Sequence, residues 1–169
     1  KNAYTISMPH ARTTPVVFAS PHSGREYSWS YLRRSVLDER AIRSSEDAFV
    51  DMLFECAPEF GAPLIACTAP RAFIDVNRSL DELDSALIEG VGKSAHNPRV
   101  ASGLGVVPRV VANGRAIYRG KLTLREARAR IDEYWHPYHD ALTALLDESR
   151  AQYGEANLID CNSKPREAI

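Results

Sequence analysis

The sequence predicts an α/β fold, a mixed sheet covered by helices. Several apolar runs rich in β-branched or aromatic residues are bounded by turn-forming or polar residues, which is typical of strands. These runs span residues 16–20, 64–68, 72–76 and 157–161. An apolar stripe at three- and four-residue spacing from Leu124 to Leu145 predicts a long helix. Strands and helices in this order favour a layered sheet over an all-β fold or a repeat.

The first half of the chain is expected to hold one helix among its strands. Residues 1–15 are expected to be a lead-in before the first strand, and residues 35–43 a short helix or turn. From Glu46 onward apolar residues recur at helical spacing, until Pro58 and Gly61 end the pattern. We therefore predict a helix between Glu46 and Pro58, ahead of the two strands that follow it.

The second half is expected to hold a long loop, a hairpin and the long helix. Residues 81–109 are rich in Gly, Ser, Asn and Pro without a period, which indicates a functional or flexible loop that borders the site. The Asn-Gly pair at 113–114 predicts a two-stranded ribbon. Thr123 and Glu126 have the spacing of a capping box, and Pro137 is expected to kink or divide the helix.

Length, charge and cysteine spacing limit the classes of function. The 169 residues are 44% hydrophobic and 25% charged, which fits a single soluble domain. The net charge of −1 does not indicate a basic surface of the kind that binds nucleic acid. No apolar run reaches the roughly 18 residues that a membrane span needs. The start of the chain lacks a signal-peptide pattern, so we expect a cytoplasmic protein. The three cysteines form no C-x-x-C pair, which argues against disulfides and a thiolate zinc site.

Three polar clusters follow element boundaries and could converge on one metal ion. His22 directly follows the first strand, at the sheet edge where open α/β folds bind ligands. Glu46 and Asp47 open the predicted helix, and residues 160–163 follow the last strand. Histidine and carboxylate from separate loops can hold zinc with a position open for water. The ordinary alternatives are a solvated loop histidine, and acidic residues that favour the first turn of any helix.

A second candidate site lies at the end of the 72–76 run. Its polar residues are Arg71, Asp75, Asn77 and Arg78. Guanidinium groups match a carboxylate in bidentate geometry, so a ligand that carries a carboxylate is the natural candidate. The alternative is an internal ion pair between Asp75 and an arginine.

Six short segments, spread over nearly the whole chain, carry a resemblance to a known family. They are SPHSG at 20–24, EDAFVD at 46–51, IDVNR at 74–78, GLGVVPR at 103–109, YWHPYH at 134–139 and IDCNS at 159–163. Together they resemble the N-formylglutamate amidohydrolase (deformylase) family, which is similar to zinc carboxypeptidases and aspartoacylase. The resemblance implies a three-layer α/β/α fold of the phosphorylase/hydrolase kind. It also implies one domain over residues 1–169 that lacks part of the family's length.

The resemblance implies a set of zinc ligands. His22 would be one, and a carboxylate of the Glu46 and Asp47 pair the second, with Asp47 preferred. The family's third ligand is a histidine, where this chain has Asn162. Because an amide oxygen is neutral and weakly basic, we expect the chain to bind zinc weakly or not at all. The general base of the family is expected beyond Ile169.

The resemblance also implies residues that bind the substrate. Arg71, Asn77 and Arg78 would bind its carboxylate, and Arg109 would be a further clamp. His139 matches a family position too, with a hydrogen bond inside the core as its alternative role.

The implied activity is zinc-dependent hydrolysis of N-formyl-L-glutamate or a related N-acyl amino acid, as in histidine degradation. The partner is thus a small molecule, with neither nucleic acid nor membrane. The alternatives are an impaired member that only binds carboxylates, and a carboxypeptidase-like peptidase. The oligomeric state stays open.

Overall fold

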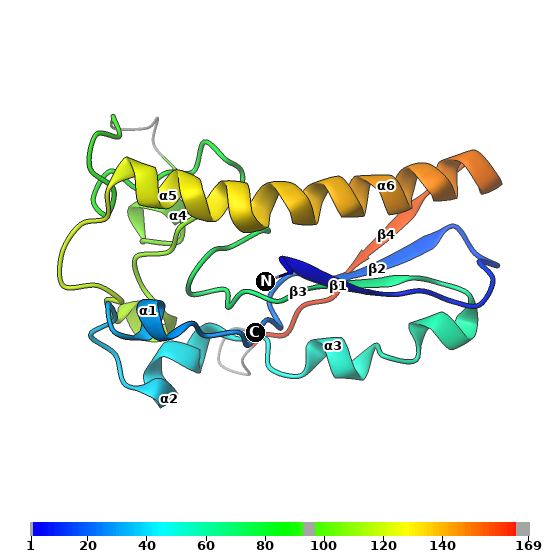
Figure 1. Cartoon of the computed structure of the whole chain (residues 1–169), viewed down its shortest axis with the longest axis horizontal. Helices are drawn as coiled ribbons and strands as arrows, with labels where there is room; N and C mark the ends of the chain where they lie inside the picture. Colours follow the sequence, from blue (N-terminus) through cyan, green and yellow to red (C-terminus); the bar gives the residue numbers. More distant parts are fainter. Residues whose placement is uncertain (1, 93–96, 165–169) are drawn as a thin grey trace.

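A four-stranded mixed sheet forms the centre of the computed structural model, which describes residues 2–92 and 97–164 (Figure 1). Its strands are β1 (Tyr4–Ser7), β2 (Val16–Ser20), β3 (Leu64–Cys67) and β4 (Asn157–Asp160). They lie in the order β1-β3-β2-β4; β2, β3 and β4 are parallel, and β1 is antiparallel to β3. The predicted α/β class with a mixed sheet is confirmed.

Helices lie on both sides of this sheet. They are α1 (Trp29–Leu32), α2 (Glu39–Ile42), α3 (Val50–Leu53), α4 (Pro98–Ala101), α5 (Leu124–Arg130) and α6 (His136–Tyr153). Short 3₁₀ turns lie at Arg43–Ser45, Ala57–Phe60 and Ala112–Gly114. In Figure 1, α6 runs along one side of the sheet and α3 lies on the other, which gives three layers of unequal thickness. Within the described residues, no helix has the length and apolar character needed to cross a bilayer.

The long helix forms as its sequence predicts. Thr123 and Glu126 make both hydrogen bonds of the capping box. Pro137 lies in the first turn of α6, and the turn before it, Ile131–Trp135, is a π-helix between α5 and α6. Proline has no N–H for the carbonyl four residues earlier, which accounts for a change of helical form at this place. Pro137 therefore divides the helix without ending it.

The predicted strand over 72–76 is wrong. Its alternate residues Ala72, Ile74 and Val76 are buried as an inward-facing set would be. Their backbone, however, forms turns in which the N–H groups of Phe73 and Ile74 donate to the carbonyl of Pro70. The alternation thus indicated which side chains are buried, whereas the proline before the run set the backbone.

The predicted helix from Glu46 is also wrong over most of its length. Only Val50–Leu53 is helical, and Phe49 before it has a left-handed backbone with φ of 63°. Phe49 and Leu53 are 58% and 73% exposed, so the apolar periodicity does not mark a buried face. Glu46 has an extended backbone, and the N–H of Asp47 donates to the carbonyl of His22 and so cannot join a helix.

Two connecting segments differ from expectation. Residues 1–15 contain β1, whose Tyr-Thr-Ile-Ser alternation is the signal that finds it. The 81–109 segment does border the cavity described below, yet the buried side chains of Leu87, Ile88, Val106 and Val107 anchor it in the core. Its residues 93–96 lie outside the described part.

Of the two-stranded ribbon predicted around residues 113–114, the turn forms but the two strands do not. Asn113 and Gly114 have φ of 61° and 69°, the positive values that an Asn-Gly hairpin turn requires. The strands beside them form only an isolated bridge between Val110 and Ala116.

Candidate active site

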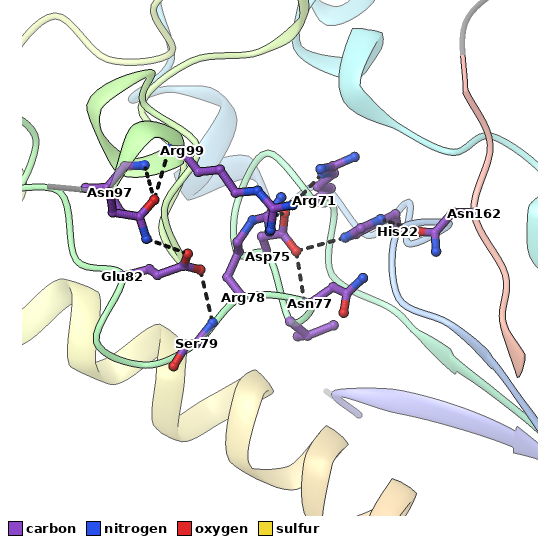
Figure 2. A network of polar contacts seen from close by, with 12 residues as sticks. His22, Arg71, Asp75, Asn77, Arg78, Ser79, Glu82, Asn97, Arg99 and Asn162 are labelled. Atoms are coloured by element: carbon purple, nitrogen blue, oxygen red, sulfur yellow. Dashed lines mark hydrogen bonds and ion pairs between the residues drawn. The ribbon is translucent and has the colours of Figure 1, made fainter. Parts of the chain in front are cut away.

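The candidate site is built on turns that follow the parallel strands. Because β2, β3 and β4 are parallel, their carboxyl ends lie at one edge of the sheet. His22 follows the end of β2, Arg71 follows β3, and Asn162 follows β4. Figure 2 shows His22 between Asp75 on one side and Asn162 on the other. The sheet edge predicted from His22 therefore does collect the polar clusters.

The imidazole of His22 is buried and has different neighbours at its two nitrogens. Nε2 lies 2.8 Å from Oδ1 of Asp75. Nδ1 lies 3.0 Å from Oδ1 of Asn162 and 3.4 Å from Oδ2 of Asp47. When the ring is neutral, an Nε2–H donated to Asp75 leaves the lone pair of Nδ1 directed at Asp47 and Asn162. This is the orientation that a metal-binding histidine takes when a carboxylate holds its other nitrogen.

The charged groups of this cluster shift one another's pKa. Burial alone would lower the pKa of His22, but its contacts with the carboxylates of Asp47 and Asp75 outweigh burial and raise that pKa above its usual value. Burial would likewise raise the pKa of Asp47 and of Asp75, yet the contacts with His22 hold both below their usual range. The cluster by itself thus favours an imidazolium between two carboxylates.

Asp47 has one satisfied and one unsatisfied oxygen. Its Oδ1 accepts a hydrogen bond of 3.0 Å from Oγ of Ser163, which ties the segment after β4 to this carboxylate. Its Oδ2 is buried and makes no hydrogen bond within the described residues. A buried carboxylate oxygen without a donor is costly unless a cation or a proton meets it. When the ring of His22 is neutral, its Nδ1 and Oδ2 of Asp47 therefore form an opening for a positively charged group.

Glu46 lies next to Asp47 in sequence but does not join the cluster around His22. Its carboxylate accepts from the hydroxyl of Tyr27 at 2.6 Å and pairs with Nε of Arg43 at 3.2 Å. Of the two carboxylates predicted as alternatives for a metal ligand, the structure places Asp47 beside His22.

Asp75 joins His22 to the predicted carboxylate-binding arginines. Its Oδ2 accepts from Nε of Arg71 at 3.1 Å and lies 3.8 Å from Nε of Arg78 (Figure 2). The internal ion pair considered as the alternative is thus present. This ion pair does not use every donor of the arginines, because Nε of Arg78 is buried and lacks a hydrogen bond within the described residues.

Asn77 belongs to the same network through its backbone. Its N–H donates to Oδ1 of Asp75 at 2.9 Å, and its side-chain amide donates to Asp160 at 3.0 Å. Asn77 therefore connects the turn after β3 to the end of β4. Neither Asn77 nor Arg78 is among the described residues that line the cavity beside the site, whereas Arg71 is.

Two residues singled out from the sequence lie outside the site. Nε of Arg109 donates to Oδ2 of Asp84 at 2.8 Å, and this arginine is not among the described residues of the cavity wall. The structure therefore gives no support to Arg109 as a clamp. Nε2 of His139 lies 2.7 Å from the carbonyl of Val76, and the ring stacks on Trp135 with centroids 3.9 Å apart. His139 thus has the core role that was its alternative.

A cavity of about 600 Å³ opens beside this cluster, a volume suited to a small molecule. The polar residues of its wall include Asp47, Asp75, Arg71 and Ser163. Its apolar wall comes from Leu104, Pro108, Val110 and Val111. Sequence reasoning included Ser163 in the polar cluster after the last strand but missed its neighbour Lys164, which also lines the cavity.

The donors beside Nδ1 of His22 fit a divalent cation in part. The unpaired Oδ2 of Asp47 and the imidazole are strong donors, and the third donor is the amide oxygen of Asn162. Within residues 2–92 and 97–164, no group of three or more His, Cys, Asp or Glu side chains is placed to hold a metal ion. The residues present therefore offer zinc two strong ligands and one weak one.

The comparisons with known proteins agree on one family. The family model for N-formylglutamate amidohydrolase matches residues 14–169. The N-formylglutamate deformylase of Pseudomonas putida is 28% identical over 156 residues, and the match covers 91% of this chain and 53% of that protein. That of Pseudomonas aeruginosa is 28% identical over 151 residues, which cover 88% of this chain and 52% of the relative. The chain therefore spans about half the length of the curated relatives it matches.

Solved structures agree with the fold. The crystal structure of N-formylglutamate amidohydrolase from Ralstonia eutropha JMP134 is similar with a TM-score of 0.91 and 34% identity, over 99% of this chain and 60% of that one. A gene product of Agrobacterium tumefaciens is similar with a TM-score of 0.69 and 18% identity, over 98% of this chain and 58% of that one. The second likeness concerns the fold alone.

Proposed function

The chain belongs to the N-formylglutamate amidohydrolase family, and from this premise we propose that it hydrolyses the amide bond of N-formyl-L-glutamate or a related N-acyl amino acid with the help of zinc. The observation that carries the proposal is the cluster of His22, Asp47 and Asn162, whose Asp47 lines a cavity that Arg71 lines as well. Hydrolysis of an N-acyl amino acid is favoured by a Lewis acid at the acyl carbonyl and by a cation that binds the substrate carboxylate, and this cavity has a place for each.

His22 and Asp47 would hold the zinc ion, with the amide oxygen of Asn162 as the third and weakest donor. Zinc bound there would supply a Lewis acid for the formyl carbonyl and for the attacking water. Asp75 keeps Nδ1 of His22 free by accepting from Nε2, and Ser163 holds Asp47 by donating to Oδ1. We predict that the general base, a carboxylate that accepts the proton of the water, corresponds to a residue of the relatives beyond the position of Ile169.

Arg71 would bind a carboxylate of the substrate. Its Nε is held by Asp75, so the terminal N–H groups of the guanidinium are the ones left for a ligand in the cavity. A guanidinium fixed at Nε is preorganised, which lowers the entropy lost when a carboxylate binds. Because Asp75 contacts both Arg71 and His22, the carboxylate and the scissile bond would be held at a defined separation.

A second candidate function is favoured by Asn162. With an amide in place of the family's histidine, the chain would bind the N-acyl amino acid in the same cavity without hydrolysing it at ordinary zinc concentrations. The two candidates share the ligand and differ in the chemistry.

One assay separates them. We expect the unmodified chain to release formate slowly from N-formyl-L-glutamate when zinc is added in excess, because zinc activates its bound water even without the family's general base. His22→Gln should release none. Formate from Asn162→His alone, with ligand binding by both proteins, would support the carboxylate-binding function. If calorimetry detects no binding of N-formyl-L-glutamate to the unmodified chain, both candidates are excluded.

A further inference from the structure

We infer that Lys164 binds the side-chain carboxylate of the substrate and so selects an acidic N-formyl amino acid over a neutral one. This inference rests on the proposed function, because it concerns the same cavity. N-formyl-L-glutamate carries two carboxylates, and its acylated nitrogen carries no charge. A cavity selective for it needs a positive group for each carboxylate.

The cavity wall supplies two such groups among the described residues, Arg71 and Lys164. Arg71 is held by Asp75, which also holds His22. The α-carboxylate has a nearly fixed distance from the scissile amide, so it matches this rigid guanidinium. The side-chain carboxylate is carried on a flexible two-carbon arm, and it matches an ammonium on a flexible stem with three donors.

The position of Lys164 is set by the two residues before it. Oδ1 of Asn162 lies 3.0 Å from Nδ1 of His22, and Oγ of Ser163 donates to Asp47 at 3.0 Å. These contacts fix the segment after β4 across the reacting centre. Lys164 is the next residue, so the same contacts hold it beside the cavity that it lines.

The carboxylates of the same wall are already engaged by other groups. Glu46 accepts from Tyr27 and pairs with Arg43. Asp47 contacts His22 and Ser163, and Asp75 contacts His22 and Arg71. Each acidic group of the cavity therefore has a partner, and the one unsatisfied oxygen, Oδ2 of Asp47, is buried and faces Nδ1 of His22, so the ammonium of Lys164 stays suited to an acidic ligand.

The test compares two ligands that differ in one charge, N-formyl-L-glutamate and the nearly isosteric N-formyl-L-glutamine, by calorimetric titration. We expect Lys164→Met to weaken binding of N-formyl-L-glutamate about five- to tenfold, the range for a charge-assisted hydrogen bond that stays partly in water. Binding of N-formyl-L-glutamine should change less than about twofold. Lys164→Arg should keep most of the preference, since it keeps the charge.

A matched control is Lys121→Met, because Lys121 is exposed, lies outside the described cavity wall and, among the residues that the structure describes, donates to the carbonyl of Ser85 alone. It should change neither affinity. Equal binding of the two ligands by the unmodified chain, or equal weakening of both by Lys164→Met, would overturn the role of Lys164 while leaving the proposed function standing. Binding of neither ligand by the unmodified chain would overturn both.

Discussion

Asp75 joins the two halves of the candidate site, because one carboxylate contacts His22, Arg71 and Arg78. It is buried, and its contacts with positive groups offset the cost of taking a charge out of water. At residue scale this makes Asp75 the positioning residue for both the metal ligand and the substrate arginine, although it touches neither reacting atom.

We expect Asp75→Asn to lower the free energy of unfolding by about 3 kcal/mol, the low end for breaking a buried ion pair, because the amide keeps one acceptor. Urea denaturation measures this. The control is Asp147→Asn, since Asp147 pairs with Arg150 on the surface with more than half of each side chain exposed, and it should change stability by less than about 0.5 kcal/mol. Equal effects of the two substitutions would contradict the role given to Asp75.

Asn162 sets the zinc affinity in this account. Asn162→His should raise that affinity at least about tenfold, because it adds an imidazole where an amide oxygen now lies 3.0 Å from His22. Zinc per chain after dialysis measures the change. The control is Asn157→His, which adds a histidine at the exposed start of β4 and should have no effect.

Near-stoichiometric zinc in the unmodified chain would show that another donor completes the site. No gain of Asn162→His over Asn157→His would show that residue 162 does not reach the metal.

At the scale of elements, the clearest agreement between sequence and structure is the start of α5. The capping box is encoded by residues three positions apart and needs no tertiary contact, so the sequence predicts it directly. We expect Thr123→Ala to lower the free energy of unfolding by about 1 kcal/mol, because an N–H of the first turn loses its acceptor. Thermal or urea unfolding measures it.

Thr143→Ala is the control for this prediction. Thr143 is exposed in the interior of α6, where alanine has the higher helix propensity, so the change should be neutral or slightly stabilising. A loss of similar size at both positions would mean that the capping hydrogen bonds are not what threonine contributes at position 123.

Elements that depend on long-range contacts were predicted less well. The helix expected from Glu46 is interrupted because Asp47 turns towards His22 and Ser163, which lie far away in sequence. The run at 72–76 was assigned to a strand from its alternating apolar residues. This alternation indicates which side chains are buried, but it does not show that the backbone pairs with another strand. In both segments the residues that depart from the local pattern are site residues or their neighbours, since the backbone there positions Asp47 and Asp75.

At the scale of the whole molecule, one face of the sheet carries most of the core. The helix α6 packs there with Tyr138, Leu142 and Leu145 among the buried residues. We expect Leu145→Ala to lower the free energy of unfolding by about 2 to 5 kcal/mol, the range for a buried leucine. Leu53→Ala, at a leucine of α3 that is 73% exposed, should cost less than about 0.5 kcal/mol. Denaturation of both variants tests this asymmetry, and a large loss at Leu53 would contradict it.

The sequence predicted several residues of the candidate site but not the contacts that join them. His22, Asp47 and Asn162 were singled out because they follow element boundaries or match family segments, and the structure brings them together. The pairing of His22 with Asp75 depends on how β2 and the turn after β3 lie side by side, which no spacing in the sequence encodes. Arg109 was expected in the site because it is an arginine in a family segment, but Asp84 holds it elsewhere.

The central claim is that the cavity beside His22 binds an N-formyl amino acid with its carboxylate at Arg71. A crystal structure of the metal-free chain soaked with N-formyl-L-glutamate tests this most directly. We expect a carboxylate of the ligand within hydrogen-bond distance of the terminal guanidinium nitrogens of Arg71, and the formyl group facing Asp47 and Asn162. Ligand density outside this cavity, or a formyl group at Arg71 with both carboxylates directed away from it, would contradict the claim.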